Sequence, residues 1–335
     1  MSGMIQANVP RTLPKGLPQV AALLIVFLVN WLVFRDFFAL RLQDGRLFGS
    51  LIDVLNRGAP VAILALGMTL VIATRGIDLS VGAVMAIAGA MAATLTSQGY
   101  PLPVALAAAV GVGLACGLWN GFLVAVLEIQ PFVATLILMV AGRGFAQLIT
   151  EGQIITFVSE GFAAIGGGSF LMLPMAVVIA IVMLIITHFI VRYTALGLFI
   201  ESIGANVRSS AYAGIGTKVV TIAVYMWCGL CAAIAGLIVT ADIRGADANN
   251  AGLWLELDAI LAVVIGGTSL FGGRFSLVLA MVGALIIQAM NTGILLSGYP
   301  PEFNLVVKAA VVLIVLLLQS PRFANAGAVL GRTRQ

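Results

Sequence analysis

The chain has 335 residues, of which 61% are hydrophobic and 9% are charged, with a formal net charge of +4. Soluble domains carry roughly a quarter charged residues, so this composition excludes a water-soluble globular protein and requires lipid as the solvent for much of the surface. Nucleic-acid binding is also disfavoured, because no cluster of Lys and Arg accompanies the small positive charge.

Ten apolar stretches have the length of membrane-crossing helices, since roughly 20 helical residues span about 30 Å of hydrocarbon. In chain order they lie near residues 18–38, 52–73, 79–97, 101–127, 131–150, 171–191, 218–241, 256–271, 275–296 and 303–320. The eighth is short and runs into a glycine cluster, which indicates a broken or re-entrant helix near residues 256–273. The sequence therefore predicts an all-α polytopic membrane protein of about ten transmembrane helices in one domain over residues 1–335, with eight or nine spans as the alternative.

The distribution of Lys and Arg predicts that both termini are cytoplasmic. With the amino terminus inside, the inside segments carry Arg11, Lys15, Arg75, Arg192, Arg208, Lys218, Arg274, Arg322, Arg332 and Arg334. The outside segments carry Arg35, Arg41, Arg46 and Arg244. In this orientation the longest inside loop runs from Arg192 to Lys218, and two long loops, 151–170 and 242–255, lie outside.

Reactive and metal-binding motifs are scarce, so we expect neither catalytic residues nor a metal site. There is one histidine, His188, and no phosphate-binding G-x-x-x-x-G-K-[ST] loop, so a partner would have to bind any ATP. Cys228 and Cys231 form a C-x-x-C, but a zinc site needs a second ligand pair. We interpret them as small apolar residues on one helix face.

Glycines at every fourth position, Gly113, Gly117 and Gly121, predict close approach of two helix backbones. A weak internal similarity also links residues 69–90 with residues 261–284, each with an apolar run, a glycine-containing break and a second run of small residues. Many transporters contain such repeats, and their interface lies on the substrate path.

Four ordered stretches carry a more specific pattern. They are MTLVIATRGIDLSVG at 68–82, GLWNGFLVAVLEIQPFVATL at 117–136, ESIGANVRSSAYAGI at 201–215 and ELDAILAVVIGGTSLFGGR at 256–274. Together they resemble the permeases of ribose-type bacterial ABC sugar importers over about residues 50–320. Within that family the chain is most similar to the galactofuranose importer permeases of enteric bacteria.

The resemblance implies a permease that moves a monosaccharide, galactofuranose or another pentose or hexose, across the bacterial inner membrane by ATP-driven alternating access. Its implied partners are a second permease subunit, identical or homologous, a tandem-domain ATP-binding subunit and a periplasmic sugar-binding protein. ATP and Mg²⁺ would sit on the ATP-binding subunit, so this chain itself would be no enzyme and hold no cofactor. An ABC permease for branched-chain amino acids and an ion-coupled secondary transporter stay open as alternatives.

The resemblance also implies that residues 199–216 form a cytoplasmic coupling segment that docks on the ATPase. The residues assigned to it are Glu201, Gly204, Ala205, Asn206, Ser209 and Gly214. Two features depart from the family pattern: Arg75 stands where glycine is common, and Val207 to Ser210 replace acidic residues. These departures leave the docking chemistry open and are compatible with a distinct partner or a heteromeric pair.

Polar and ionisable residues within the spans or next to their ends are candidates for a translocation path, because such residues are costly in the membrane. They are Asp78, Asn120, Gln130, Arg143, Gln147, Asp258, Gln288 and Asn291. A path for neutral sugars would use amides and hydroxyls, but the same amides could equally hold helices together. Asp78 could likewise cap the start of a helix.

Overall fold

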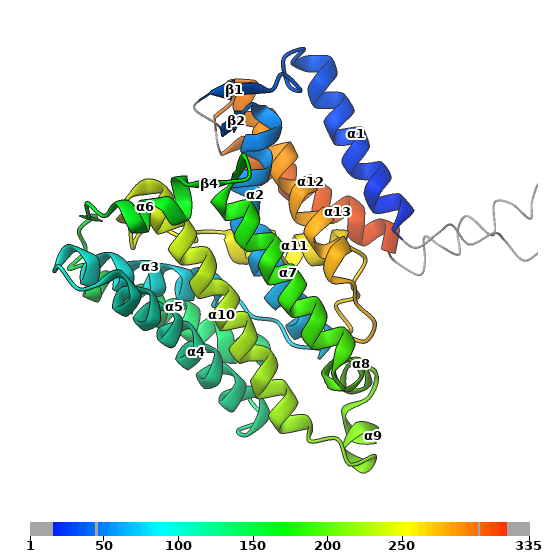
Figure 1. Cartoon of the computed structure of the whole chain (residues 1–335). Coiled ribbons are helices and arrows are strands. Elements are labelled where there is room, and N and C mark those ends of the chain that lie inside the picture. Colours follow the sequence, from blue (N-terminus) through cyan, green and yellow to red (C-terminus); the bar gives the residue numbers. More distant parts are fainter. Residues whose placement is uncertain (1–15, 44–45, 301, 320–335) are drawn as a thin grey trace, which may run out of the picture.

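The computed structural model describes residues 16–43, 46–300 and 302–319 (Figure 1). Five of the basic residues that support the predicted orientation, Arg11, Lys15, Arg322, Arg332 and Arg334, lie outside the described residues. The helices are α1 (Leu17–Val33), α2 (Ser50–Ala73), α3 (Val81–Ser97), α4 (Leu102–Ala125), α5 (Pro131–Ile149), α6 (Glu160–Gly167), α7 (Met175–Tyr193), α8 (Leu196–Ala205), α9 (Val207–Tyr212), α10 (Thr217–Ile243), α11 (Leu255–Ile265), α12 (Leu277–Leu296) and α13 (Phe303–Gln319).

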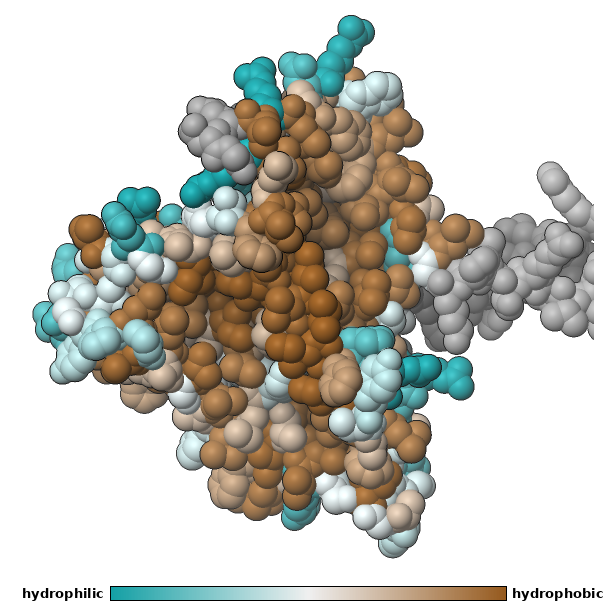
Figure 2. Space-filling model, viewed as in Figure 1, coloured by the Kyte–Doolittle hydropathy of each residue, from teal (hydrophilic) through white to brown (hydrophobic). Residues whose placement is uncertain are grey.

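Six helices in the described part of the chain, α2, α4, α5, α7, α10 and α12, are long and apolar enough to cross a membrane. Helices α1 and α3 are apolar but have 17 residues each, and α11 has 11. Figure 2 shows one face of the molecule largely covered by apolar side chains, with hydrophilic residues gathered toward its margins. The chain is therefore a helical polytopic membrane protein.

The eighth predicted helix is wrong in its carboxyl-terminal boundary. Helix α11 ends at Ile265, and residues 266–276 form no helix. Gly267, Gly272 and Gly273 have φ angles of +87°, +81° and +98°, which belong to the left-handed region and end a right-handed helix. The predicted break is confirmed, and the helix before it is shorter than expected.

Helix α10 lies at the centre of the packing and contacts α2, α3 and α4 (Figure 1). The predicted close packing of the glycines in α4 is confirmed: a Cβ at Gly117 would lie 2.6 Å from the Met226 Cα atom of α10, and one at Gly121 would lie 2.8 Å from the Ile222 Cα atom. Cys228 and Cys231 are free, buried and packed against Gly67 of α2. This confirms the interpretation of the C-x-x-C as small packing residues.

We expect Gly117→Leu to lower the stability of the protein by about 1–3 kcal/mol, because the side chain would meet backbone atoms of α10 that cannot move aside. Gly111→Leu is the matched control, since the Cβ position at Gly111 of the same helix has no atom within 4 Å. The apparent melting temperature in detergent would fall for Gly117→Leu and stay near wild type for Gly111→Leu. Equal melting temperatures for both variants would contradict the packing described here.

The two long loops predicted to lie outside are joined by a short sheet. Strand β3 (Ile155–Thr156) in one loop pairs antiparallel with β6 (Gly245–Ala246) in the other. The first loop also contains α6, a helix that the glycine-rich sequence did not predict; the Ser159 hydroxyl accepts a hydrogen bond from the Phe162 amide and caps its start. The remaining strands form two hairpins, β1 (Arg41–Gln43) with β2 (Arg46–Phe48) and β4 (Ser169–Phe170) with β5 (Leu173–Pro174).

We refer to two non-helical segments as breaks: the first break is residues 74–80 between α2 and α3, and the second break is residues 266–276 between α11 and α12. They fall in the two segments with weak internal similarity. The breaks touch: the Gly273 amide donates a 2.9 Å hydrogen bond to the carbonyl of Ala73, the last residue of α2 before the first break, and a Cβ at Gly272 would lie 2.5 Å from the Arg75 Cγ atom. Two irregular segments far apart in sequence therefore meet at one point. The first break is mostly buried, whereas much of the second break, including Phe271 and Arg274, is exposed.

Candidate functional site

The predicted coupling segment folds into two short helices, α8 and α9, that follow α7 (Figure 1). Asn206 separates them because its extended backbone, with φ of −161°, ends α8. Its side-chain Oδ1 accepts a 3.0 Å hydrogen bond from the Ser209 amide, which caps the start of α9. Gly214 follows α9 in the left-handed region, with φ of +84°, and turns the chain toward α10.

The coupling segment has an outer and an inner side. Ala205, Asn206, Ser209 and Gly214 are exposed, whereas Gly204 is buried. A Cβ at Gly204 would overlap the Ala73 carbonyl oxygen and the Gly273 amide nitrogen, so α8 rests directly on both breaks. The exposed side lies on the surface, and the buried side is in contact with the long helices and the breaks.

Arg75 in the first break binds the end of α8. Its Nε donates a 2.6 Å hydrogen bond to the Gly204 carbonyl, and its Nη2 donates a 2.6 Å hydrogen bond to the Ala205 carbonyl. The last carbonyls of a helix lack partners within the helix, and a cation is favourable there. Arg75 adopts φ of +64°, a conformation that costs a non-glycine residue about 1–2 kcal/mol.

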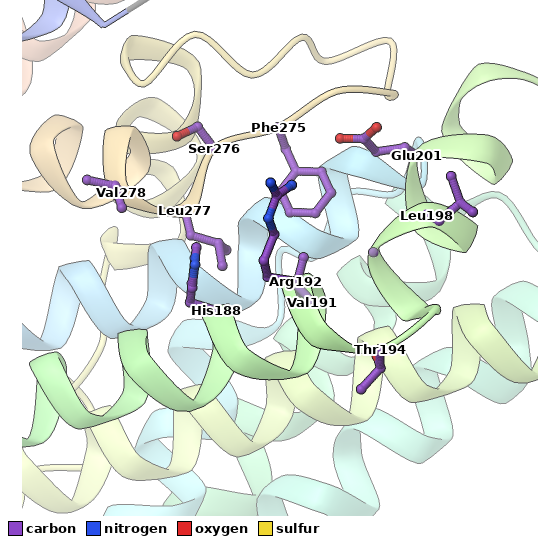
Figure 3. Close-up of a pocket in the computed structure, with 11 residues that line it drawn as sticks. His188, Val191, Arg192, Thr194, Leu198, Glu201, Phe275, Ser276, Leu277 and Val278 are labelled. Atoms are coloured by element: carbon purple, nitrogen blue, oxygen red, sulfur yellow. The ribbon is translucent and has the colours of Figure 1, made fainter.

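Glu201 is half-buried on the inner side of α8. It lines a cavity of about 410 Å³ together with His188 and Arg192 at the end of α7 and Phe275 in the second break. Figure 3 shows the Arg192 and Glu201 side chains extending into this space from α7 and α8. Within the coupling segment, Glu201 thus lies on the side that faces α7 and the second break, away from the exposed residues of α9.

Two predicted path residues, Asp78 and Asn120, meet in a buried polar cluster. The Asp78 Oδ1 accepts hydrogen bonds from the Ser80 amide at 2.9 Å and from the Ser80 hydroxyl at 2.6 Å. The Asn120 Nδ2 of α4 donates to the Ser80 hydroxyl at 2.8 Å and lies 3.5 Å from the Asp78 Oδ1. Asp78 and Asn120 are 2% and 1% exposed, and the Asn120 Oδ1 has no hydrogen-bond partner. Asp78 therefore holds the start of α3 through Ser80, and the Asn120 Oδ1 beside it is a buried acceptor without a partner.

Arg143 and Gln147 lie one turn apart on α5 and bind the same loop, residues 242–255. The Arg143 Nη1 donates hydrogen bonds to the Ala248 and Ala251 carbonyls, and the Gln147 Nε2 donates one of 2.8 Å to the Asn249 Oδ1. In the same loop, hydrogen bonds, the strongest from the Asn250 side chain, lower the pKa of Asp247. Both side chains on α5 thus hold residues 247–251 in place.

The other four path candidates lie apart from these groups. Asp258 of α11 forms a 2.8 Å ion pair with Lys308 of α13, a pairing the sequence did not predict because 50 residues separate the two. Gln288 is buried on α12 near Gly58 of α2. Asn291 is half-buried on α12, and Gln130 is exposed at the start of α5. The described residues contain no group of three or more His, Cys, Asp or Glu side chains that could hold a metal ion.

Comparison with known proteins gives consistent matches. The family described as the branched-chain amino acid transport system / permease component matches residues 50–316. The galactofuranose transporter permease protein YtfT of Escherichia coli is 66% identical over 93% of this chain and 92% of its own length. The fructose import permease FruF of Bifidobacterium longum is 41% identical over 94% and 90%, and the ribose import permease RbsC of E. coli is 38% identical over 82% and 86%. No solved structure gives a significant match.

These relatives are sugar permeases, which agrees with the resemblance in the four sequence stretches and does not favour the branched-chain amino acid and secondary-transporter alternatives. The chain is a transporter subunit rather than an enzyme, and it belongs to the branched-chain amino acid transport system / permease component family, among the permease subunits of ABC sugar importers.

Proposed function

We propose that this permease imports galactofuranose, or another pentose or hexose, into the cytoplasm by ATP-driven alternating access. The single observation that carries the substrate is the high identity, over nearly the whole chain, to a permease named for galactofuranose. A neutral sugar also fits the buried cluster of Asp78, Ser80 and Asn120, which contains a carboxyl, a hydroxyl and an amide.

We further propose ten membrane-crossing segments in the bacterial inner membrane, with both termini cytoplasmic. Six cross as the long helices, α1 and α13 add two, and residues 74–97 and 255–274 cross as a helix plus an irregular break. The start of α1 supports this arrangement: Gly16 and Gln19 line the same cavity as Glu201 and Gly267, so α1 begins on the α8 face. Residues 1–335 would form one permease domain.

The exposed side of residues 199–216 would dock on a tandem-domain ATP-binding subunit, which would hold ATP and Mg²⁺. The coupling residues are Glu201, Gly204, Ala205, Asn206, Ser209 and Gly214. A second permease subunit would complete the membrane channel, and a periplasmic sugar-binding protein would deliver the sugar. This division fits the chain, whose sequence has no phosphate-binding loop.

We propose Asp78 and Asn120 as the first residues to test for contact with the sugar. They are buried together, and the Asn120 Oδ1 is an unused acceptor. Arg143, Gln147, Asp258, Gln288, Asn291 and Gln130 are retained as path candidates, although the first three already bind loop or ion-pair partners.

The test is uptake of labelled galactofuranose into liposomes that contain the full complex of both permeases and the ATPase, with the binding protein outside and ATP inside. We expect uptake that requires both ATP and the binding protein. Competition by excess unlabelled ribose or fructose measures how well each sugar is accepted relative to galactofuranose. Leucine serves as the control solute.

Two results would contradict the proposal, and a third would narrow the substrate within it. Uptake that persists without ATP, or that follows a proton gradient alone, would favour a secondary transporter. Leucine uptake without sugar uptake would indicate an amino acid permease. A complex that transports ribose but not galactofuranose would keep the importer and change its substrate.

A further inference from the structure

We propose that Arg75 is a positioning residue that ties the coupling segment to the buried Asp78–Asn120 cluster, so that displacement of α8 is passed directly to the start of α3. The inference rests on the proposed function, because it assumes that an ATPase moves residues 199–216. The two hydrogen bonds from the guanidinium to the Gly204 and Ala205 carbonyls are the contacts that carry it.

The guanidinium suits this position for a geometric reason. Its planar fork presents several N–H donors at fixed angles, whereas the lysine ammonium is a point charge on a flexible stem. Arg75 uses two nitrogens of the fork on two successive carbonyls, both at 2.6 Å. These carbonyls end α8, where a cation is favoured, so the contact fixes both the position and the direction of the helix end.

The backbone that connects Arg75 to the Asp78–Asn120 cluster is short and tightly packed. Only Gly76 and Ile77 separate Arg75 from Asp78. A Cβ at Gly76 would lie 2.6 Å from the Tyr225 hydroxyl and 2.9 Å from a methyl group of Val71, so the backbone there is tightly enclosed. Close-packed segments transmit displacement instead of absorbing it.

The backbone of Arg75 supports the same inference. A non-glycine residue in the left-handed region is strained, and such strain persists where the surroundings fix the residue. Glycine at this position would adopt φ of +64° without strain but would lose both hydrogen bonds. Arg75→Gly therefore removes the two side-chain hydrogen bonds while the backbone keeps its left-handed conformation.

The experiment measures the number of sugar molecules imported per ATP hydrolysed by the complete reconstituted importer. For Arg75→Gly we expect this ratio to fall about tenfold, within the range common for coupling between sites, while ATP hydrolysis continues. For Arg75→Lys, which keeps the charge but loses the planar fork of donors, we expect a smaller fall in this ratio. Arg274→Gln is the charge control: Arg274 is exposed next to Gly273 and should keep the wild-type ratio.

A wild-type ratio in Arg75→Gly would overturn the inference. If Arg75→Gly fails to assemble, Arg75→Lys decides, and a wild-type ratio there would overturn it as well. An equal fall in Arg274→Gln would mean that positive charge on this face, rather than the contact with α8, sets the ratio, and would also overturn it. Absence of ATP-dependent uptake in the wild-type complex would instead contradict the proposed function.

Discussion

Gly204→Ala is expected to reduce ATP-driven sugar uptake by at least about tenfold, because the added methyl group would separate α8 from both breaks. The Cβ would overlap the Ala73 carbonyl oxygen and the Gly273 amide nitrogen, which are backbone atoms on both sides. These two atoms also form the 2.9 Å hydrogen bond that joins the breaks. The substitution therefore acts where the coupling segment meets the membrane-embedded helices.

The control for Gly204→Ala is Gly111→Ala. Gly111 lies on α4, outside the coupling segment, and has no atom within 4 Å of its Cβ position. Uptake is measured per purified complex in liposomes, together with ATP hydrolysis. If Gly204→Ala transports as well as Gly111→Ala, close contact between α8 and the breaks is not needed for transport.

Asp78→Ala is expected to destabilise the protein by roughly 2–6 kcal/mol, because the Ser80 amide and hydroxyl would lose their buried acceptor at about 1–3 kcal/mol for each donor left unpaired. Loss of this acceptor also frees the start of α3, so uptake should fall together with stability. The apparent melting temperature in detergent and the uptake rate are the two measurements.

Asp78→Asn separates hydrogen bonding from charge. Asparagine keeps an oxygen at the Oδ1 position and can still accept from Ser80, so it should retain most of the stability that alanine loses. Equal losses in Asp78→Asn and Asp78→Ala would show that the carboxyl group acts through its charge. Wild-type stability in Asp78→Ala would contradict the structural role assigned to the cluster.

Hydropathy predicted the helical segments well where a helix runs uninterrupted. The prediction of 52–73 compares with α2 at Ser50–Ala73, and 275–296 compares with α12 at Leu277–Leu296. Lipid requires a long apolar run with its backbone satisfied internally, so such helices are visible in the sequence alone. Glycine spacing in α4 likewise predicted close packing, although its partner α10 could not be named.

Features that depend on contacts between distant residues escaped prediction. Asp258 lies in the eighth predicted span and Lys308 in the tenth, and neither sequence position indicates the other. Arg75 was visible only as a departure from a family pattern, because the positive φ and the α8 carbonyls exist only in the folded chain. Helix α6 is too short for a hydropathy signal, and only the cap Ser159 followed by Glu160 could have suggested it.

The path candidates show the same limit. A polar residue in an apolar span indicates that its side chain needs a hydrogen-bond partner, and the sequence does not identify that partner. Asp78 and Asn120 are 42 residues apart in sequence and lie in contact, whereas Arg143 donates hydrogen bonds to loop carbonyls. Amide and guanidinium groups bind whatever partner folding brings near, so their partners follow from the fold.

The side of the membrane on which residues 199–216 emerge is the most direct test of the proposed mechanism. A cysteine in place of the exposed Ser209 is treated with a membrane-impermeant maleimide, with the wild-type chain as the control because Cys228 and Cys231 are buried and Cys116 is partly buried. We expect labelling in inside-out vesicles, reduced when the ATPase is bound, and none from outside intact spheroplasts. Labelling of the Ser209→Cys chain from outside would place the coupling segment on the wrong face and contradict an ATP-driven permease of this design.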